Sequence, residues 1–231
     1  MLGIIGAMSQ EVAKLKEKMD HVTVDKAAGM EFFCGAIDGR DVVVVRSGIG
    51  KVNAAVCSQI LVDRYHVTAI VNTGIAGSLK NEINIGDIVL SKDTLQHDMD
   101  ATGFGYSLGQ IPQMDKSIFE GDSHMIQVAE ECCRRVAPEI GVHVGRVVSG
   151  DQFVSDRVKK AWLTETFHGY CTEMEGAAIA QTAYLNEIPF LIIRAISDKA
   201  DDSAEMDYEL FEEKAIEHSV KLVLAILQKL D

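Results

Sequence analysis

The chain has 231 residues, of which 47% are hydrophobic and 25% are charged, a composition typical of globular proteins and unlike that of disordered chains. Its 35 acidic residues outnumber its 22 lysines and arginines, so the formal net charge is −13 at pH 7. Such a charge repels phosphate backbones and anionic lipids, which disfavours nucleic-acid and membrane-surface binding and leaves neutral or cationic small molecules as ligands.

Short apolar runs, glycine turns and helical patterns alternate along the chain. Apolar and β-branched runs indicate buried strands, which we expect at Leu2 to Ile5, Arg40 to Arg46, Thr68 to Asn72, Gly86 to Gln96, Val142 to Ser149 and Pro189 to Ser197. Helical spacing predicts a helix after Gly6, with Val12, Leu15 and Met19 on its apolar face. Further helices are expected at Lys51 to Tyr65, His124 to Ala137, Asp156 to Phe167, Glu173 to Asn186 and from Met206 onward.

This alternation predicts an α/β fold in one domain over residues 1–231, with a central mixed, largely parallel sheet flanked by helices. Only three prolines occur and no Ser/Gly-rich linker is seen, which argues against two domains. There is no apolar run near the roughly 20 residues that span a bilayer, no basic leader and no CxxC pair, so we expect a cytoplasmic protein with reduced cysteines. Residues 97–122 are too many for an ordinary loop and are expected to serve function or an interface.

Acidic residues stand where such a sheet would bind its ligand, which is beyond the carboxyl ends of the strands. Glu11 and Asp198 follow expected strands, and Glu175 lies at the start of an expected helix. Each alone has an ordinary explanation, such as a favourable charge at a helix N-terminus. Together they suit hydrolysis through an oxocarbenium ion, because one carboxyl group activates water, one faces the developing positive charge and one protonates the leaving group. The set favours a glycosidic or nucleosidic hydrolase.

Cofactor and metal motifs are weaker. The sequence SGIGK, from Ser47 to Lys51, lacks the earlier glycine of a phosphate loop, and Asn53 stands where the dinucleotide fingerprint needs its third glycine. Residues His97 to Asp100 include metal-ligand types without a known spacing, so a solvated loop is the simpler interpretation. We therefore expect neither a cofactor nor a metal.

Three local features have ordinary structural interpretations. Thr172 is expected to cap a helix that begins at Glu173. The acidic segment from Asp201 to Glu213 is expected to form a solvated rim. Phe153 suits either the core or a stacking surface for a ligand, and the residue pattern leaves both open.

Eight segments, taken in order and spacing, carry a family resemblance. They are GIIGAMSQEV (Gly3 to Val12), SGIGKVNAA (Ser47 to Ala55), NTGIAG (Asn72 to Gly77), GDIVLS (Gly86 to Ser91), HDMDATGFGYSLGQIP (His97 to Pro112), SGDQFV (Ser149 to Val154), TEMEGAAIAQ (Thr172 to Gln181) and RAISDKAD (Arg194 to Asp201). This set resembles the 5′-methylthioadenosine/S-adenosylhomocysteine nucleosidases of the purine nucleoside phosphorylase superfamily. The resemblance spans almost the whole chain.

The resemblance implies a nucleoside phosphorylase-like fold and hydrolysis of the N-glycosidic bond of these two substrates. It makes Glu11 the base that activates water and Asp198 the acid that protonates adenine N7. It also makes Glu175 the group that binds the ribose hydroxyls and faces the oxocarbenium-like charge. Since a carboxyl group donates a proton at neutral pH only if its pKa is raised, we expect Asp198 to be desolvated.

The resemblance also implies a wider set of binding residues and a homodimer. Phe153 would stack on adenine, the backbone of Val154 would complete its recognition, Met174 would hold the ribose, and Arg194 with Glu173 would support the water. The substrate-binding residues expected in total are Met8, Ile49, Gly77, Phe153, Val154, Glu173, Met174, Arg194, Ser197 and Tyr208, with Met8, Ile49 and Tyr208 around the 5′-thio substituent. Phe104, Tyr106 and Pro112 would enter the pocket of the partner subunit. No cofactor or metal is implied, and the pathway would be methionine salvage.

One departure and three alternatives accompany the resemblance. Ile75 stands where many members have a serine that helps to hold the water, which leaves the anchoring of that water open. Phosphorolysis is disfavoured because Asn72 is neutral where phosphorylases commonly have a cationic residue, and because Glu11 would repel phosphate. Hydrolysis of a futalosine-type substrate stays open. A nucleoside-binding protein without activity would be expected to lack Glu11 or Asp198, and both are present.

Overall fold

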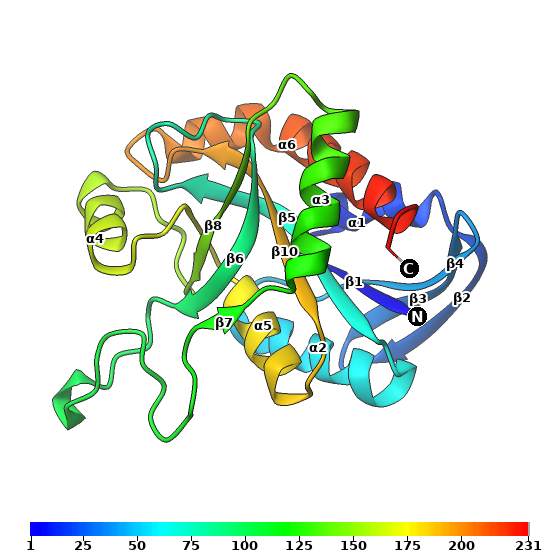
Figure 1. Cartoon of the computed structure of the whole chain (residues 1–231), viewed down its shortest axis with the longest axis horizontal. Helices are drawn as coiled ribbons and strands as arrows, with labels where there is room; N and C mark the ends of the chain where they lie inside the picture. The colour runs from blue at the N-terminus through cyan, green and yellow to red at the C-terminus, as the bar shows by residue number, and fades with distance from the viewer. Residues whose placement is uncertain (231) are drawn as a thin grey trace.

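The computed structural model describes residues 1–230, whose strands and helices are arranged around one extended sheet (Figure 1). The strands are β1 (Leu2–Gly6), β2 (Asp20–Ala27), β3 (Met30–Ile37), β4 (Arg40–Arg46), β5 (Ala69–Ser78), β6 (Ile88–Gln96), β7 (Phe119–Glu120), β8 (Val142–Ser149), β9 (Cys171–Glu173) and β10 (Phe190–Asp198). The helices are α1 (Ser9–Lys16), α2 (Lys51–Tyr65), α3 (Ser123–Val136), α4 (Arg157–Phe167), α5 (Gly176–Leu185) and α6 (Ala204–Leu227), with a 3₁₀ turn, η1 (Thr102–Phe104).

The sheet is open at one end and closed into a ring at the other. From its outer strand the order is β2, β3, β4, β1, β5, and β5 then pairs with both β9 and β10. Because β10 also pairs with β6, β6 with β8 and β8 with β9, these strands and β5 form a closed ring. Pairings are parallel for β1 with β4 and β5, for β5 with β10, and for β8 with β6 and β9, and the others are antiparallel. The expected α/β fold with a mixed sheet is confirmed.

Helices cover both faces of the sheet (Figure 1). One core lies between the sheet and α1, α3 and α6, and a second lies between the sheet and α2 and α5. The valines of β4 show why this strand is apolar throughout, because Val42 and Val44 enter the first core while Val43 and Val45 enter the second. A strand that is buried on both faces needs no polar alternation.

The glycine-rich motif after the third expected strand is part of the sheet, not a loop. β5 continues to Ser78 because β10 pairs with it in parallel along the whole motif, with Arg194 opposite Gly74 and Asp198 opposite Gly77. The expected end of this strand at Asn72 was therefore wrong. Because glycine has no side chain, functional groups of other segments can lie directly against the strand at Gly74 and Gly77.

Two helix boundaries also differ from expectation. Glu173 lies in β9, which pairs with β5 and β8, and α5 begins at Gly176 with Glu175 as its N-cap, so neither Glu173 nor Thr172 begins or caps the helix. α1 ends at Lys16, although Met19 beyond it is buried in the same core as expected. For α5, the pairing of β9 with distant strands decided the boundary.

Sequence reasoning missed the β2–β3 hairpin at the open end of the sheet. Its strands are joined by Ala28 and Gly29, both with positive φ, and Asp38 and Gly39 form a second turn of this kind before β4. An Asp-Gly pair between apolar runs is a strong hairpin signal that could have revealed β3. β2 carries a weaker signal, because nearly all its side chains are exposed.

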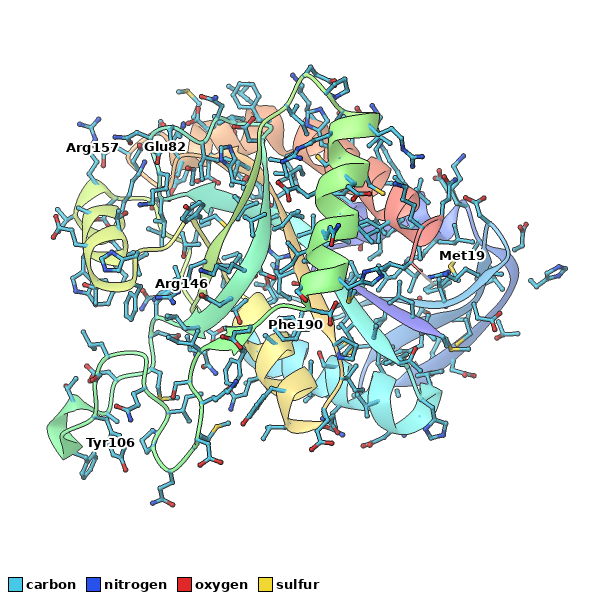
Figure 2. All side chains as sticks on the ribbon, in the orientation of Figure 1. Met19, Glu82, Tyr106, Arg146, Arg157 and Phe190 are labelled. Atoms are coloured by element: carbon cyan, nitrogen blue, oxygen red, sulfur yellow. The ribbon has the colours of Figure 1, made fainter. Side chains whose placement is uncertain are left out.

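The long segment 97–122 has little regular structure, with only η1 and the short β7 assigned. Figure 1 shows it extending away from the body of the molecule, and Tyr106 lies near its far end in Figure 2. Within residues 1–230, no helix has both the length and the apolar character needed to cross a membrane.

Candidate active site

A cavity of about 560 Å³ opens where the carboxyl ends of β1, β5, β9 and β10 meet the N-terminal turns of α1 and α6. Many of the residues expected at the site line it. These are Met8, Glu11, Ile49, Gly77, Phe153, Val154, Glu173, Met174, Glu175, Ser197, Asp198 and Tyr208. Segments that are far apart in the sequence thus meet at the edge of the sheet, where ligands of α/β folds bind.

Glu11 is placed by the start of α1. Its Oε2 accepts hydrogen bonds from the backbone N–H groups of Ala7 (2.6 Å) and Met8 (2.9 Å), so that the same carboxylate caps the helix and faces the cavity. Burial raises the pKa of Glu11, while these amides and the charge of Arg194 lower it, and the net direction is upward. A carboxylate with a raised pKa is a stronger base than one in water.

Glu173, which lines the cavity, forms a buried ion pair with Arg194, which lies behind it. Arg194 also donates to Oδ1 of Asn72 (2.5 Å), and Asn72 in turn donates to the carbonyl of Ile5 (2.9 Å). Burial of Glu173 acts to raise its pKa, but the charge of Arg194 and a hydrogen bond from Ser149 outweigh it and hold the pKa below its ordinary value. Glu173 is therefore a permanent carboxylate, held in one orientation.

Glu175 lies only two residues further and has the opposite electrostatic environment. Its Oε1 accepts one hydrogen bond, from the backbone N–H of Gly50 at 2.8 Å, where a φ of 96° makes glycine the suitable residue. Burial, with the nearby negative charge of Glu173, raises the pKa of Glu175 to about 8. A positive charge in the cavity would restore the ionised form.

Asp198 stands at the last position of β10, after a register shift between Ile196 and Asp198 against β5. A bulge of this kind redirects a side chain. Oδ2 accepts from the hydroxyl of Ser197 (2.8 Å), and Oδ1 accepts from the backbone N–H of Ala200 (2.7 Å). The residue is 2% exposed, and this burial raises its pKa, which confirms the expected desolvation.

Aromatic and apolar side chains complete the cavity. Phe153 is half exposed, and its ring meets that of Tyr208 edge-on at 6.0 Å between centroids. The hydroxyl of Tyr208 lies 3.3 Å from Sδ of Met8 and 3.3 Å from Oε1 of Glu212. The exposure of Phe153 favours a surface that stacks on a ligand over a core role.

Some expected residues lie outside the cavity wall of this chain. Arg194 is buried and is not among the lining residues, although it pairs with Glu173, which is. Phe104, Tyr106 and Pro112 belong to the projecting segment and are not among the lining residues, and Phe104 is 88% exposed. The acidic segment expected to be a rim is in part a wall, because it contributes Glu205, Tyr208 and Glu209 to the lining.

Sequence reasoning missed several contributors to the site. Ser149 donates from its hydroxyl to Glu173 and accepts from the backbone N–H of Ala177 (2.7 Å), which fixes the start of α5. Asn72 orients Arg194. Both residues end or interrupt apolar strands, a signal that could have drawn attention to them. The glycine motif around Gly50 was recognised, but no local pattern pairs its amide with Glu175.

The chemistry available is that of carboxyl groups with different protonation states. Within the described part of the chain, no group of three or more His, Cys, Asp or Glu side chains is arranged to hold a metal ion. A Cβ atom at Gly74 would lie 2.8 Å from Oε1 of Glu11, and one at Gly77 would lie 2.6 Å from Oδ1 of Asp198, so the two carboxyl groups lie against positions three residues apart along β5. This arrangement can activate water at one point and protonate a leaving group at another.

Comparisons with known proteins agree with this geometry. A family model described as the phosphorylase superfamily matches residues 1–228. The 5′-methylthioadenosine/S-adenosylhomocysteine nucleosidase of Staphylococcus aureus (strain JH9) is 40% identical over 231 residues, which is the full length of both chains.

Solved structures extend the likeness to the whole fold. The nucleosidase of the same name from Neisseria meningitidis, in complex with methylthio-immucillin-A, has a TM-score of 0.95 and 38% identity over 99% of both chains. The futalosine hydrolase of Helicobacter pylori strain 26695 has a TM-score of 0.94 and 30% identity over 99% of this chain and 97% of its own. The chain therefore belongs to the phosphorylase superfamily and, within it, to the family of 5′-methylthioadenosine/S-adenosylhomocysteine nucleosidases.

Proposed function

We propose that the protein is an N-ribosyl hydrolase that cleaves 5′-methylthioadenosine and S-adenosylhomocysteine. The products are adenine and 5-methylthioribose or S-ribosylhomocysteine. One observation carries the proposal, which is that two desolvated carboxyl groups with raised pKa values, Glu11 and Asp198, face one cavity from separate points along β5. The 40% identity to a nucleosidase over the full chain supports the choice of substrates.

In this mechanism Asp198 donates a proton to N7 of adenine as the C–N bond breaks. Adenine is a poor leaving group as an anion, so protonation lowers the barrier, and the burial that raises the pKa of Asp198 makes this carboxyl group a better proton donor than an exposed aspartate. The Ser197 hydroxyl and the Ala200 amide hold the carboxyl group in one orientation. Phe153 stacks on the base and the backbone of Val154 completes its recognition, next to Gly77.

Glu11, which lies against β5 at Gly74, takes a proton from the attacking water. Glu175, next to Met174, binds the ribose hydroxyls and faces the ribosyl ring, where the developing positive charge lowers its pKa and makes it an anionic partner. Glu173 and Arg194 keep this wall rigid and support the water, whose anchoring relies on Glu11 and not on the apolar side chain of Ile75.

The same site disfavours phosphorolysis. Its lining includes no lysine, arginine or histidine side chain, and the nearby Arg194 is already bound to Glu173 and Asn72. A phosphate nucleophile would enter a cavity lined by carboxylates without a counter-ion. Futalosine-type substrates are the second candidate, favoured by the likeness to a futalosine hydrolase at 30% identity.

We further propose that residues 1–231 work as one domain in a homodimer. Phe104, Tyr106 and Pro112 would complete the 5′ end of the partner's cavity, and the exposed apolar side chains of Val52 and Val56 on α2 would lie in the interface. In such a dimer the projecting segment 97–122 would contact the partner subunit. A Phe104→Ala variant is expected to raise KM with a smaller change in kcat.

The proposed setting is methionine salvage in the cytoplasm. The five cysteines are all unpaired in the structure, which suits a reducing compartment. Burial raises the pKa of Cys57 to about 12, so this thiol stays protonated and chemically quiet.

The decisive experiment is adenine release from 5′-methylthioadenosine, first without phosphate and then with it. Wild-type protein is expected to release adenine at a rate that phosphate does not change. Asp198→Asn is expected to lower kcat by about 10²–10⁴-fold, the contribution typical of a general acid. Asp202→Asn, an exposed neighbour that pairs with Arg157, serves as the matched control and is expected to keep activity.

Two outcomes would contradict the proposal. Release that requires phosphate would assign the chain to phosphorolysis and remove the role of Glu11 as a base for water. No release under either condition would leave the futalosine-type substrate or a binding protein, and a futalosine-type nucleoside assayed in the same way would separate these two.

A further inference from the structure

The charged side chains of the cavity wall are all acidic. Six carboxyl side chains contribute to it, and no cationic side chain does; the acidic residues are Glu11, Glu173, Glu175, Asp198, Glu205 and Glu209. The proposed hydrolysis uses the first four. Glu205 and Glu209 have no part in it, although both lie beside Tyr208 on α6.

Glu205 and Glu209 lie at the part of the wall assigned to the 5′ substituent. They are four residues apart on one helix and so share a face, with Tyr208 next to them. The hydroxyl of Tyr208 contacts Sδ of Met8, which joins this helix to the start of α1. Both glutamates are exposed to solvent, so their carboxylates stand at the mouth of the cavity rather than in its depth.

Neither glutamate has a counter-ion. The acidic residues just before them are neutralised, because Asp201 pairs with Lys160 (3.4 Å) and Asp202 with Arg157 (2.7 Å). Among residues 1–230 no such ion pair includes Glu205 or Glu209. The helix dipole explains Glu205, which is in the first turn of α6, but Glu209 lies beyond the range of that effect.

The negative field reaches the groups inside. Burial raises the pKa of Tyr208, and the negative charge of Glu212 raises it further, with an additional contribution from Glu11. Glu212 lies on α6 and Glu11 on α1, so the negative potential at Tyr208 comes from more than one element. A substituent that lies beside Tyr208 and the two glutamates experiences this negative potential.

We propose that Glu205 and Glu209 make the enzyme select substrates by the charge of their 5′ substituent. Neutral and cationic 5′-thioethers of adenosine are accepted, and thioethers that end in a carboxylate are disfavoured. This inference rests on the proposed function, and it narrows that function to a substrate class. A zwitterionic amino-acid tail satisfies the rule when its ammonium group lies against the two glutamates and its carboxylate points to solvent.

The test uses three 5′-thioethers of adenosine with tails of similar length, ending in a methyl, an ammonium and a carboxylate group. kcat/KM is measured for each at low and high salt, with wild-type protein and with Glu205→Gln/Glu209→Gln. In the wild type the ammonium tail is expected to exceed the carboxylate tail by about tenfold at low salt, and less at high salt. The double variant is expected to bring this ratio close to one.

Two further samples make the result specific. Glu139→Gln/Glu165→Gln removes the same number of charges from exposed residues that do not line the cavity, and it is expected to keep the wild-type ratio. Equilibrium binding of the three compounds to Asp198→Asn, by calorimetry, measures the same preference without turnover. A complete lack of hydrolysis would then overturn the proposed function while binding still decides this inference.

The inference fails if the carboxylate tail is processed or bound as well as the ammonium tail in the wild type. It also fails if the preference exists but is the same in Glu205→Gln/Glu209→Gln, because another feature would then be its source. Loss of the preference in the Glu139/Glu165 control would show an effect of net charge and would equally contradict it.

Discussion

The carboxyl groups at the two ends of the cavity have different electrostatic surroundings. Around Arg194, three glutamates share one buried guanidinium, and Glu173 is held ionised by it. Asp198 has no ion pair among residues 1–230; it accepts hydrogen bonds from the Ser197 hydroxyl and the Ala200 amide, and burial raises its pKa. The comparison teaches that a direct ion pair with the arginine, and not residue type, separates a carboxyl group that is held ionised from one whose pKa is raised.

Glu175 shows that the influence of Arg194 is short-ranged. It lies near the same arginine but accepts only the Gly50 amide, and the charge of Glu173 opposes its ionisation. Glu173 satisfies the guanidinium directly, so little of that charge is left for its neighbour. The ion pair between Glu173 and Arg194 thus lowers the pKa of Glu173, and the charge of Glu173 contributes to the raised pKa of Glu175.

Substitution of Arg194 is expected to have the largest effect, because it removes the cation that holds Glu173 ionised. Arg194→Met leaves Glu173 buried without its partner, and we expect a loss of about 3–5 kcal/mol in the free energy of unfolding, measured by urea denaturation. Glu173→Gln/Arg194→Met removes both charges and is expected to recover part of this loss. If the double variant were less stable than Arg194→Met, the ion pair would not be the source of the effect.

The titration of Glu175 gives a smaller effect that depends on pH. In the folded protein this carboxyl group keeps its proton up to about pH 8, whereas an ordinary glutamate loses it near 4.5. The folded state therefore binds more protons in this window, and stability falls as the pH rises from about 4.5 to about 8.

Between pH 6 and pH 8 this group is expected to contribute a loss of about 2 kcal/mol in unfolding free energy. Glu175→Gln should remove that slope, and Glu165→Gln, which changes an exposed glutamate, should keep it. Equal pH dependence in the wild type and Glu175→Gln would show that Glu175 is already ionised in the empty cavity.

Alanine substitutions at Gly74 and Gly77 of β5 would perturb the two ends of the cavity one at a time. These variants have the smallest expected effect. A Cβ at Gly74 would lie 2.8 Å from Oε1 of Glu11, and a Cβ at Gly77 would lie 2.6 Å from Oδ1 of Asp198. Each alanine is expected to cost about 1–3 kcal/mol in kcat/KM through displacement of the carboxyl group.

The pH profile of kcat/KM separates the two glycine variants. Gly74→Ala should shift the acidic limb, where Glu11 must lose its proton. Gly77→Ala should shift the alkaline limb, where Asp198 must keep its own. Shifts of the same limb in both variants would mean that the two ends do not act as a separate base and acid.

Much of the fold is predictable from local pattern. The bounds of β4, α2 and β8 agree with expectation to the residue, because β-branched runs and glycine turns define them locally. Glu11 and Asp198 were also identifiable, since each follows an apolar strand in a sheet of this class.

The electrostatics of the site could not be predicted in this way. Glu173 looked like a helix start, but its place in β9 depends on pairing with β5 and β8, and its ionisation depends on Arg194 from β10. The opposite pKa directions of Glu173 and Glu175 therefore arise from contacts between distant segments. No local pattern of residues contains that information.

The closed ring of strands links catalysis to the order in which the chain is made. β10 is the last strand in the sequence to join the ring, where Phe190 pairs with Ile70, and it brings both Arg194 and Asp198. A growing chain that has not yet reached this strand holds Glu11, Glu173 and Glu175 but lacks Arg194, Asp198 and the two glutamates of α6 that line the cavity. Since such distant pairings form slowly, the first release of adenine during refolding would time the moment at which the ring closes.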